Sequence, residues 1–222
     1  MKTTIIMIRH GQSIANAQSR FAGHSDFDLT DLGREQAELA AQYLYKSGQR
    51  VDKIYSSDLL RAHNTALPFS KKYGLPINDT ASLREIFAGS WESMTVDEIY
   101  AQYPEAFTTW RTDFSKARCT DGESTVELYN RIVAFVKELA KANEGKTLLL
   151  ATHATPIRAV ECASLGLSAD HIGDVSFVRN SSINIFECEN GTITPVKTDI
   201  VDHLDESQIT VVPKNLDDVH KN

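Results

Sequence analysis

An uninterrupted apolar run constrains the fold of this chain more than any other feature of its sequence. The run Thr147–Thr152 holds four consecutive apolar residues, Leu148–Ala151, and has the composition of a strand. A strand with one face in water alternates apolar and polar residues, whereas a continuous run is typical of a strand covered on both faces, as in a parallel sheet. The run Thr3–Ile8 predicts a second buried strand.

Segments with helical periodicity separate the strands. Thr30 can cap a helix that ends near Gly48. A strand near Lys53–Ser56 leads into a second helix, and Ser124 with Glu127 forms a capping box in front of a clear apolar stripe. This alternation of strands and helices predicts an α/β fold.

We expect residues 1–222 to form one three-layer domain, in which a mostly parallel sheet carries helices on both faces. Residues 84–122 interrupt the alternation because they contain both tryptophans and no strong strand. We interpret them as a helical cap insertion over the C-terminal ends of the strands. Asn190-Gly191 predicts a β-hairpin, and residues 199–222 are expected to form an acidic C-terminal tail.

The charge balance argues against several partners. The chain has 23 Lys and Arg against 30 Asp and Glu, a net charge of −7. Binding to nucleic acid or to a membrane surface needs a basic face, so neither partner is expected. Cys119, Cys162 and Cys188 are widely separated, which suits a reducing compartment. With no apolar run long enough for a leader or a membrane span, a cytoplasmic protein is the default expectation.

Cationic or titratable side chains follow three predicted strands. Arg9 and His10 follow the first strand, His153 follows the continuous apolar strand, and Arg61 lies one turn into the helix after the strand near residue 55. Ligands of open α/β sheets bind at the carboxyl ends of the strands, so we expect these side chains to face one another. A cation near a helix N-terminus opposes the helix dipole by about 0.3–1 kcal/mol, a cost that a bound anion would offset.

Two chemistries could use two arginines and two histidines. A metal ion could be bound by His10, His153 and a carboxylate, but Arg9 and Arg61 would repel a divalent cation. A phosphoryl dianion fits better, because arginine matches its oxygens bidentately and histidine can act as donor or nucleophile. We therefore favour an anion site and expect no metal.

The segment Arg9-His10-Gly11, with Ser13 and Asn16 after it, resembles the signature of the histidine phosphatase superfamily, which includes the cofactor-dependent phosphoglycerate mutases. Further segments continue the resemblance in chain order: Asp28–Gly33, Ser56–Ala62, Leu83–Ile86 with Gly89, Trp91-Glu92, Gly122–Ser124, and Thr152-His153 with Pro156–Arg158. The resemblance covers roughly residues 3 to 190 and is far more specific than a lone short motif.

The resemblance implies a metal-independent hydrolase of small organic phosphomonoesters that needs no cofactor. His10 would attack phosphorus and become a phosphohistidine, while Glu85 would protonate the departing alkoxide and then deprotonate the attacking water. The residues implied to bind or assist at the phosphoryl group are Arg9, Arg61, His153, Asn16 and Ser13.

This chemistry sets requirements on protonation. The ring of His10 must be neutral to attack, and neighbouring arginines favour that state. His153 would be more useful protonated, as a donor to a phosphoryl oxygen. Glu85 must be protonated when the ester binds, because an alkoxide is a poor leaving group, and this favours an acidic optimum.

Three positions depart from the family pattern. Gln12 stands where glutamate is common, and Ser93 and Ala154 stand where glycine is common. None of these changes removes a catalytic group, so we expect activity with an altered pocket shape.

Simpler roles compete with the functional ones. Arg61 could pair with Asp58, and Glu85 could pair with Arg84, as surface ion pairs of little energetic value. Ser13 and Asn16 could be turn or capping groups.

Two other functions remain open. A phosphoglycerate mutase of this family would carry a longer segment between Glu85 and His153 and an adjacent pair of arginines, whereas Arg111 and Arg118 are isolated here. A non-catalytic phosphate-binding module would need a damaged nucleophile or acid, and the sequence shows neither. Specificity is expected to lie in residues 84–122, whose aromatics favour an organic phosphate, and a homodimer is compatible with the sequence.

Overall fold

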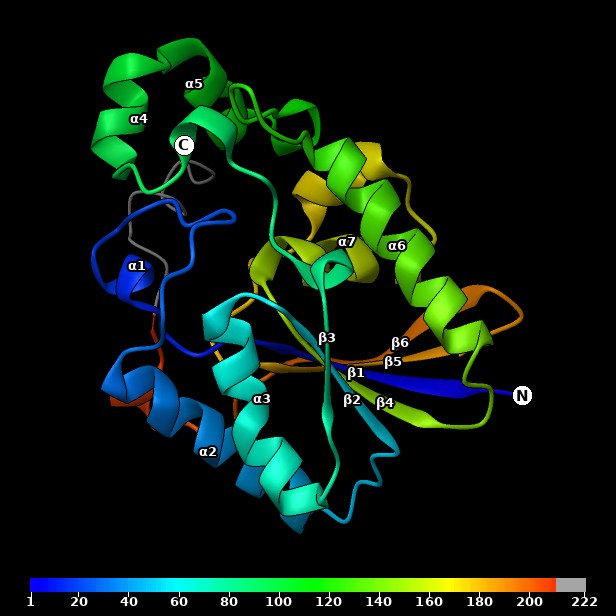
Figure 1. Ribbon diagram of the computed structural model, residues 1–222. Coiled ribbons are helices and arrows are strands. Elements are labelled where there is room, and N and C mark those ends of the chain that lie inside the picture. The colour runs from blue at the N-terminus through cyan, green and yellow to red at the C-terminus, as the bar shows by residue number, and fades with distance from the viewer. Residues whose placement is uncertain (211–222) are drawn as a thin grey trace.

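A six-stranded sheet forms the middle layer of the computed structural model, which describes residues 1–210 (Figure 1). The strands are β1 (Thr3–Arg9), β2 (Lys53–Ser57), β3 (Ile77–Thr80), β4 (Thr147–Thr152), β5 (Ile183–Glu189) and β6 (Thr192–Ile200). Their order in the sheet is β3-β2-β4-β1-β5-β6. The first four of these positions are joined by parallel pairings, and β5 and β6 add an antiparallel edge.

Helices cover both faces of the sheet. The α-helices of the described residues are α1 (Ile14–Ala17), α2 (Asp31–Lys46), α3 (Leu60–Tyr73), α4 (Val96–Gln102), α5 (Pro104–Thr112), α6 (Thr125–Lys141) and α7 (Ala154–Ser164). In Figure 1, α2 and α3 lie on one side of the sheet and α6 and α7 on the other. The predicted α/β fold of three layers is confirmed.

Two apolar cores explain why the central strands are apolar along their whole length. In β1, Ile5 and Met7 belong to the core shared with α6 and α7, and the alternate residues Ile6 and Ile8 belong to the core shared with α2 and α3. The four residues Leu148–Ala151 of β4 divide between the two cores in the same way. Side chains of a strand alternate between faces, so a strand with two buried faces needs an apolar residue at every position.

The expected helix caps are present. The Thr30 side chain accepts a hydrogen bond from the backbone N–H of Gly33 at the start of α2. Ser124 and Glu127 form the reciprocal capping box of α6. The hairpin at Asn190-Gly191 joins β5 to β6, as predicted.

Two features of the sheet differ from expectation. β3 was not predicted, because its sequence Ile-Asn-Asp-Thr is mostly polar and it lies at an edge where one long side has no neighbour. The expected tail from residue 199 is wrong at its start, since Asp199 and Ile200 end β6 and Asp199 pairs with Arg179 at 2.8 Å. The rest of the expected tail from residue 211 lies outside the described residues.

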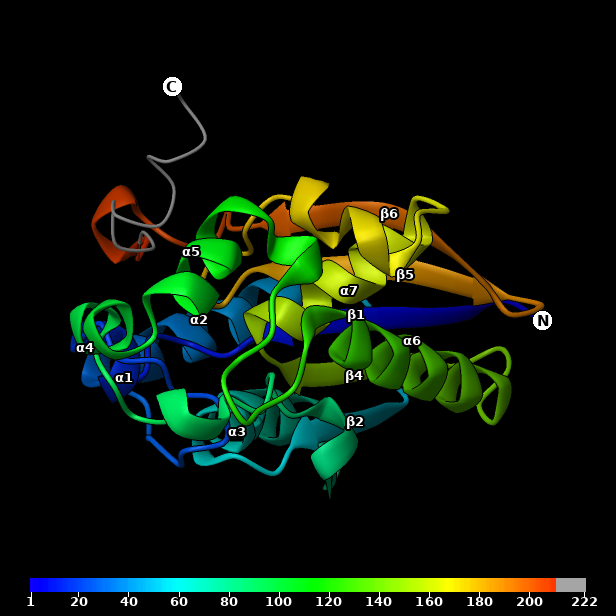
Figure 2. The ribbon, with the colours of Figure 1, turned by 90° about the horizontal axis from the view of Figure 1, so that it is seen from above.

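Residues 84–122 contain α4 and α5 and pack around a buried aromatic group. Trp91 is fully buried and contacts Phe107 and Trp110 edge to face. The chain just after β1 holds this segment, because the N–H of Phe21 donates to the Met94 carbonyl at 2.8 Å. Figures 1 and 2 place α4 and α5 near α1, at the end of the sheet toward which β1 runs.

Candidate active site

The register of β1 and β4 brings the two predicted histidines together. Arg9 lies opposite Thr152 in the parallel pair, and the N–H of His10 donates to the Thr152 carbonyl at 2.9 Å. His10 and His153 therefore directly follow the paired ends of two adjacent strands. Their ring centroids lie 5.1 Å apart with the rings tilted by 63°. Both side chains are buried, at 4% and 0% exposure.

One hydrogen bond fixes the tautomer of His10. Its Nδ1 lies 2.7 Å from the carbonyl oxygen of Gly11. A carbonyl only accepts, so Nδ1 carries the proton, and in the neutral ring Nε2 keeps its lone pair. This arrangement leaves Nε2 able to act as a nucleophile.

The second histidine is anchored by the end of the neighbouring strand β2. His153 Nε2 lies 2.9 Å from the Ser57 hydroxyl oxygen. Its other ring nitrogen, Nδ1, is buried and has no hydrogen-bond partner among the described residues. That nitrogen is available to a ligand.

Arg9 is a buried cation at the edge of the site. One terminal nitrogen of its guanidinium donates to the Val178 carbonyl, and the guanidinium carbon lies 4.9 Å from the centre of the Phe177 ring. Its Nε is buried without a partner among residues 1–210. Burial lowers the pKa of Arg9 to about 10, so the group remains charged at neutral pH.

Arg61 is a second buried cation, in the first turn of α3. Its Nη2 donates to the Gly23 carbonyl at 2.7 Å and its Nη1 donates to the Ser25 carbonyl at 2.9 Å. Only 1% of the residue is exposed, and its Nε has no partner in the described part of the chain. Burial lowers the pKa of Arg61 to about 10. The simpler ion pair with Asp58 is absent, because Asp58 accepts both hydrogen bonds from Arg84.

The pKa values of both histidines are held well below 6.5. Burial is the main cause, and the positive charges of Arg61 and Arg9 add to it. For His10 this is the neutral state that was expected. For His153 it differs from the expected imidazolium, because burial and the nearby guanidinium groups both disfavour a positive charge on its ring.

The Glu85 carboxylate faces the same site. Its Oε1 accepts from the N–H of Ile86 at 2.8 Å, and its Oε2 lies 3.4 Å from the N–H of Thr155 at the start of α7. Its negative charge raises the pKa values of Arg9 and Arg61, against the larger effect of their burial. The adjacent Arg84 is occupied by Asp58, so the simpler Glu85–Arg84 ion pair is absent.

Ser13 and Asn16 form the cap of α1. The Asn16 Oδ1 accepts from the backbone N–H and the hydroxyl of Ser13, both at 3.0 Å. Ser13 is fully buried and its hydroxyl is used in this cap. The Asn16 oxygen is thus used within the protein, and its amide nitrogen is the group that can donate to a ligand.

Sequence reasoning missed the residues that brace the site through the backbone. Asn180 is buried, and its Nδ2 donates to the His10 carbonyl at 2.9 Å and lies 3.4 Å from the Asn16 Oδ1. The Nε2 of His24 lies 2.9 Å from the Glu85 carbonyl oxygen. Neither residue follows a predicted strand, so no positional signal singled it out.

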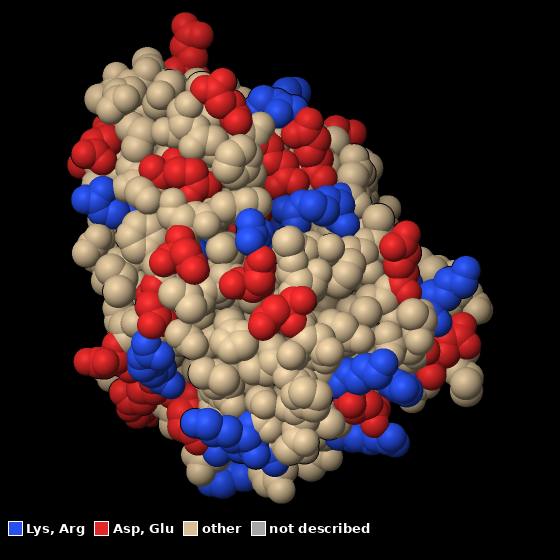
Figure 3. All heavy atoms as spheres, viewed as in Figure 1, with Lys and Arg blue, Asp and Glu red and all other residues tan. Residues whose placement is uncertain are grey.

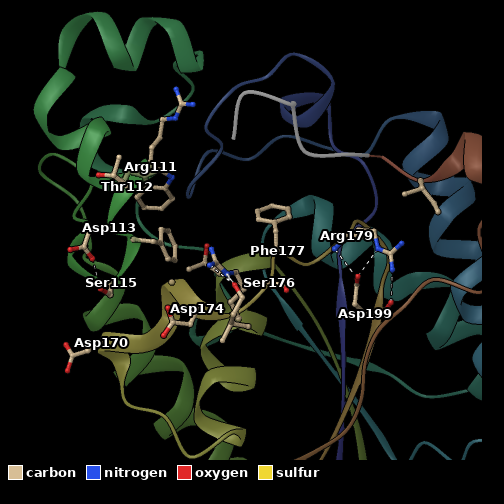
Figure 4. Close-up of a pocket in the computed structure, with 17 residues that line it drawn as sticks. Arg111, Thr112, Asp113, Ser115, Asp170, Asp174, Ser176, Phe177, Arg179 and Asp199 are labelled. Atoms are coloured by element: carbon tan, nitrogen blue, oxygen red, sulfur yellow. Dashed lines mark hydrogen bonds and ion pairs between the residues drawn. The ribbon is translucent and has the colours of Figure 1, made fainter. Parts of the chain in front are cut away.

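A cavity of about 670 Å³ borders this site. Thr155 and Phe177, which contact Glu85 and Arg9, line the cavity. Its other walls include Trp110, Phe114, Arg158, Asp174, Arg179 and Asp199. Figure 4 shows Phe177 between the residues of the 84–122 segment and the Arg179–Asp199 pair.

Charged side chains of both signs are mixed on the surface. On the face shown in Figure 3, Lys and Arg are interspersed with Asp and Glu. In residues 1–210, no three His, Cys, Asp or Glu side chains are grouped closely enough to hold a metal ion together. Within the same residues no helix is both long and apolar enough to cross a bilayer.

The sequence matches the histidine phosphatase superfamily (branch 1) over residues 5–200. The chain belongs to this family. Phosphoserine phosphatase 1 of Hydrogenobacter thermophilus is 34% identical to this histidine phosphatase over 202 residues, which are 91% of this chain and 94% of the relative. A glucosyl-3-phosphoglycerate phosphatase of Mycolicibacterium vanbaalenii is 38% identical over 188 residues, 79% and 82% of the two chains.

Solved structures agree with the family assignment. Bacillus stearothermophilus YhfR superposes on this histidine phosphatase with a TM-score of 0.85 at 28% identity, covering 91% of this chain and 100% of the other. Family and relatives together make the protein an enzyme of the phosphoric monoester hydrolase class.

Proposed function

We propose that this histidine phosphatase hydrolyses small organic phosphomonoesters without a metal ion, through a phosphohistidine on Nε2 of His10. One observation carries the proposal. A neutral histidine with a free Nε2 lies in the field of two buried arginines, each with an unpaired Nε. This combination of a neutral nucleophile and nearby fixed cations suits attack on a phosphoryl dianion.

In the first step, Nε2 of His10 attacks phosphorus as the bond from phosphorus to the ester oxygen breaks. Protonated Glu85 transfers its proton to that oxygen, and the alcohol leaves. A positioned acid of this kind is typically worth about 10²–10⁴-fold in rate.

In the second step, the Glu85 carboxylate takes a proton from a water molecule while the water oxygen attacks the phosphorus of the phosphohistidine. The N–P bond breaks and its electron pair returns to Nε2. The products are inorganic phosphate and neutral His10, with Glu85 protonated for the next cycle.

In this proposal, cationic and amide donors stabilise the charge that develops on the three equatorial oxygens. Arg9 and Arg61 supply two permanent cations, and Asn16 supplies an amide donor. A bound dianion also favours proton uptake by His153, whose Nδ1 would then donate to an oxygen. A lowered pKa of His153 and a donor role in the complex with substrate are therefore compatible.

The organic part of the substrate is assigned to the cavity beside Thr155 and Phe177. The 84–122 segment contributes Trp110 and Phe114 to its walls, which supports the expected role of this segment in specificity. Phosphoserine and glucosyl-3-phosphoglycerate are the first natural esters to test, because relatives are named for them.

Metal-independent turnover that depends on His10 tests this proposal. Hydrolysis of p-nitrophenyl phosphate is measured in the presence of EDTA for the wild type, His10→Ala and the control His63→Ala. His63 is a partly exposed histidine whose Nδ1 lies 2.8 Å from the Asp79 carboxylate. We expect turnover in the wild type and the control, loss of at least about 10³-fold in His10→Ala, and an acid-labile phosphoenzyme trapped by rapid quenching.

Other outcomes would contradict the proposal in different ways. Turnover retained by His10→Ala would exclude the phosphohistidine route. A requirement for 2,3-bisphosphoglycerate would favour the mutase. Phosphate binding with no turnover of any ester would favour the binding module.

A further inference from the structure

We propose that Glu92 is a positioning residue that fixes the phosphate-binding guanidinium of Arg61 through the turn Gly23–Ser25. The inference rests on the proposed function, because it assigns Arg61 to the phosphoryl group. Glu92 belongs to the Trp91-Glu92 segment of the 84–122 region, and the mechanism above gives it no role.

The Glu92 carboxylate accepts hydrogen bonds from the backbone of this turn. Its Oε1 accepts from the N–H of His24 at 2.7 Å, and its Oε2 accepts from the N–H of Ser25 at 2.7 Å and from the Ser25 hydroxyl. Oε1 also accepts from the N–H of Ala88 at 3.1 Å. Both carboxylate oxygens are thus used in binding local donors.

The same turn holds Arg61 from its other side. The Gly23 carbonyl that accepts from Arg61 belongs to the same peptide group as the His24 N–H that donates to Glu92. The Ser25 carbonyl provides the second contact to Arg61. A single planar peptide group therefore joins the carboxylate to the guanidinium, and hydrogen bonds in such a chain polarise and orient one another.

Close packing leaves the turn little freedom. Gly23 has a φ of +49°, and a Cβ there would lie 2.2 Å from the Glu92 Oε1. Trp91, the residue before Glu92, is fully buried, so the carboxylate projects from a fixed part of the 84–122 segment. The negative charge of Glu92 also raises the pKa of Arg61 against the effect of burial.

The orientation of Arg61 matters because two of its nitrogens are occupied by the turn and its Nε is left for the ligand. A displaced turn would rotate the guanidinium and spoil its fit to the phosphoryl oxygens. Displacements of about 1 Å can cost on the order of 10²-fold in rate. We therefore expect Glu92→Gln to lower kcat/KM by about tenfold to a hundredfold, because the amide NH₂ would face a backbone donor of the turn.

A double-mutant cycle separates positioning from general structural damage. The values of kcat/KM for p-nitrophenyl phosphate and the dissociation constant for orthovanadate are measured in the wild type, Glu92→Gln, Arg61→Ala and the double variant. If Glu92 acts through Arg61, Glu92→Gln has little further effect in the Arg61→Ala background. The matched control is Glu98→Gln, since Glu98 accepts the Thr95 N–H at 2.7 Å in the cap of α4 and lies outside the site.

The outcomes distinguish this inference from the proposed function. Equal losses in Glu92→Gln and Glu98→Gln, or additive losses with Arg61→Ala, would overturn the role of Glu92. A wild type that neither turns over the ester nor binds vanadate would overturn the proposed function itself.

A milder variant keeps the test decisive if Glu92→Gln does not fold. Ser25→Ala removes only the hydroxyl that donates to Glu92 and keeps the carbonyl that holds Arg61. A smaller loss of the same kind, absent in the Arg61→Ala background, is expected. An undiminished kcat/KM in Ser25→Ala together with an unfolded Glu92→Gln would assign Glu92 a purely structural role.

Discussion

Three nitrogen atoms of the site are buried without a hydrogen-bond partner among the described residues: Arg9 Nε, Arg61 Nε and His153 Nδ1. A buried polar group left unpaired typically costs about 1–3 kcal/mol. All three belong to groups that were predicted to bind the phosphoryl group. The oxygens of a phosphoryl group can accept from all three nitrogens, so the substrate would supply hydrogen-bond partners that the described residues do not provide.

The acid role of Glu85 can be tested by changing the leaving group. In Glu85→Gln, we expect hydrolysis of an alkyl phosphate such as phosphoserine to fall by about 10²–10⁴-fold. Hydrolysis of p-nitrophenyl phosphate should fall much less, because p-nitrophenolate leaves without a proton. The control is Glu105→Gln, at an exposed position in α5. Equal losses on both esters would contradict the assignment of Glu85 as the proton donor to the leaving group.

The sequence predicted the site residues whose side-chain chemistry is distinctive. It did not predict the residues that act by binding backbone groups. Arg9, His10 and His153 could be predicted because they follow buried strands. The roles of Asn180 and Glu92 depend on which carbonyl or N–H lies beside them. Backbone groups are alike at every position, so such partners become visible only when the chain is folded.

At the scale of elements, the start of α2 packs directly on the loop that follows β1. A Cβ on Gly33 would lie 2.0 Å from the Gln12 carbonyl oxygen, and a Cβ on Gly11 would lie 2.2 Å from the Gly33 carbonyl oxygen. The backbones at Gly11–Gln12 and at Gly33 therefore approach so closely that there is no room for a side chain at either glycine. This contact holds the loop behind His10 against a helix.

Gly33→Ala tests that contact. We expect the variant to lose about 1–3 kcal/mol in the free energy of unfolding, because the methyl group must push two backbone segments apart. Gly173→Ala is the control, since its Cβ would meet only ordinary van der Waals neighbours at 3.7 Å or more. Urea unfolding followed by circular dichroism gives both values, and similar stabilities for the two variants would contradict the close approach.

Strong local patterns made the central elements predictable, and their absence explains the errors. β4 and the capped helices α2 and α6 were found because two-sided burial and caps leave clear signals. β3 is a short edge strand whose polar residues match a loop equally well. The end of β6 was predicted as part of the tail because an aspartate in an acidic segment is typical of a solvated surface. In the structure Asp199 pairs with Arg179 instead.

For the whole molecule, the two buried histidines make stability depend on pH. Their pKa values are lowered from 6.5 in the folded state, so below about pH 6.5 the unfolded chain binds more protons than the native protein. The free energy of unfolding therefore falls as the pH drops from about 6.5 toward the lowered pKa values. The lowered pKa values of Asp28, Asp52 and Asp58 act separately, at pH values near and below 3.8.

Urea unfolding at pH 7.5 and pH 5.5 measures this effect. We expect the wild type to be less stable at pH 5.5, and a double variant with His10→Gln and His153→Gln to show a clearly smaller difference. Inorganic phosphate should stabilise the wild type, because a ligand that binds only the native state shifts the equilibrium toward it. An equal pH dependence in the wild type and the double variant would show that other groups control stability in this range.

The parallel register of β1 and β4 links catalysis to the order of folding. His10 and His153 meet only after two segments from opposite parts of the chain have paired, with several helices between them in sequence. Contacts of such long sequence separation form slowly. The rate at which activity returns after dilution from denaturant therefore measures the pairing of β1 with β4. Helices that form before this pairing would restore helical content without restoring activity.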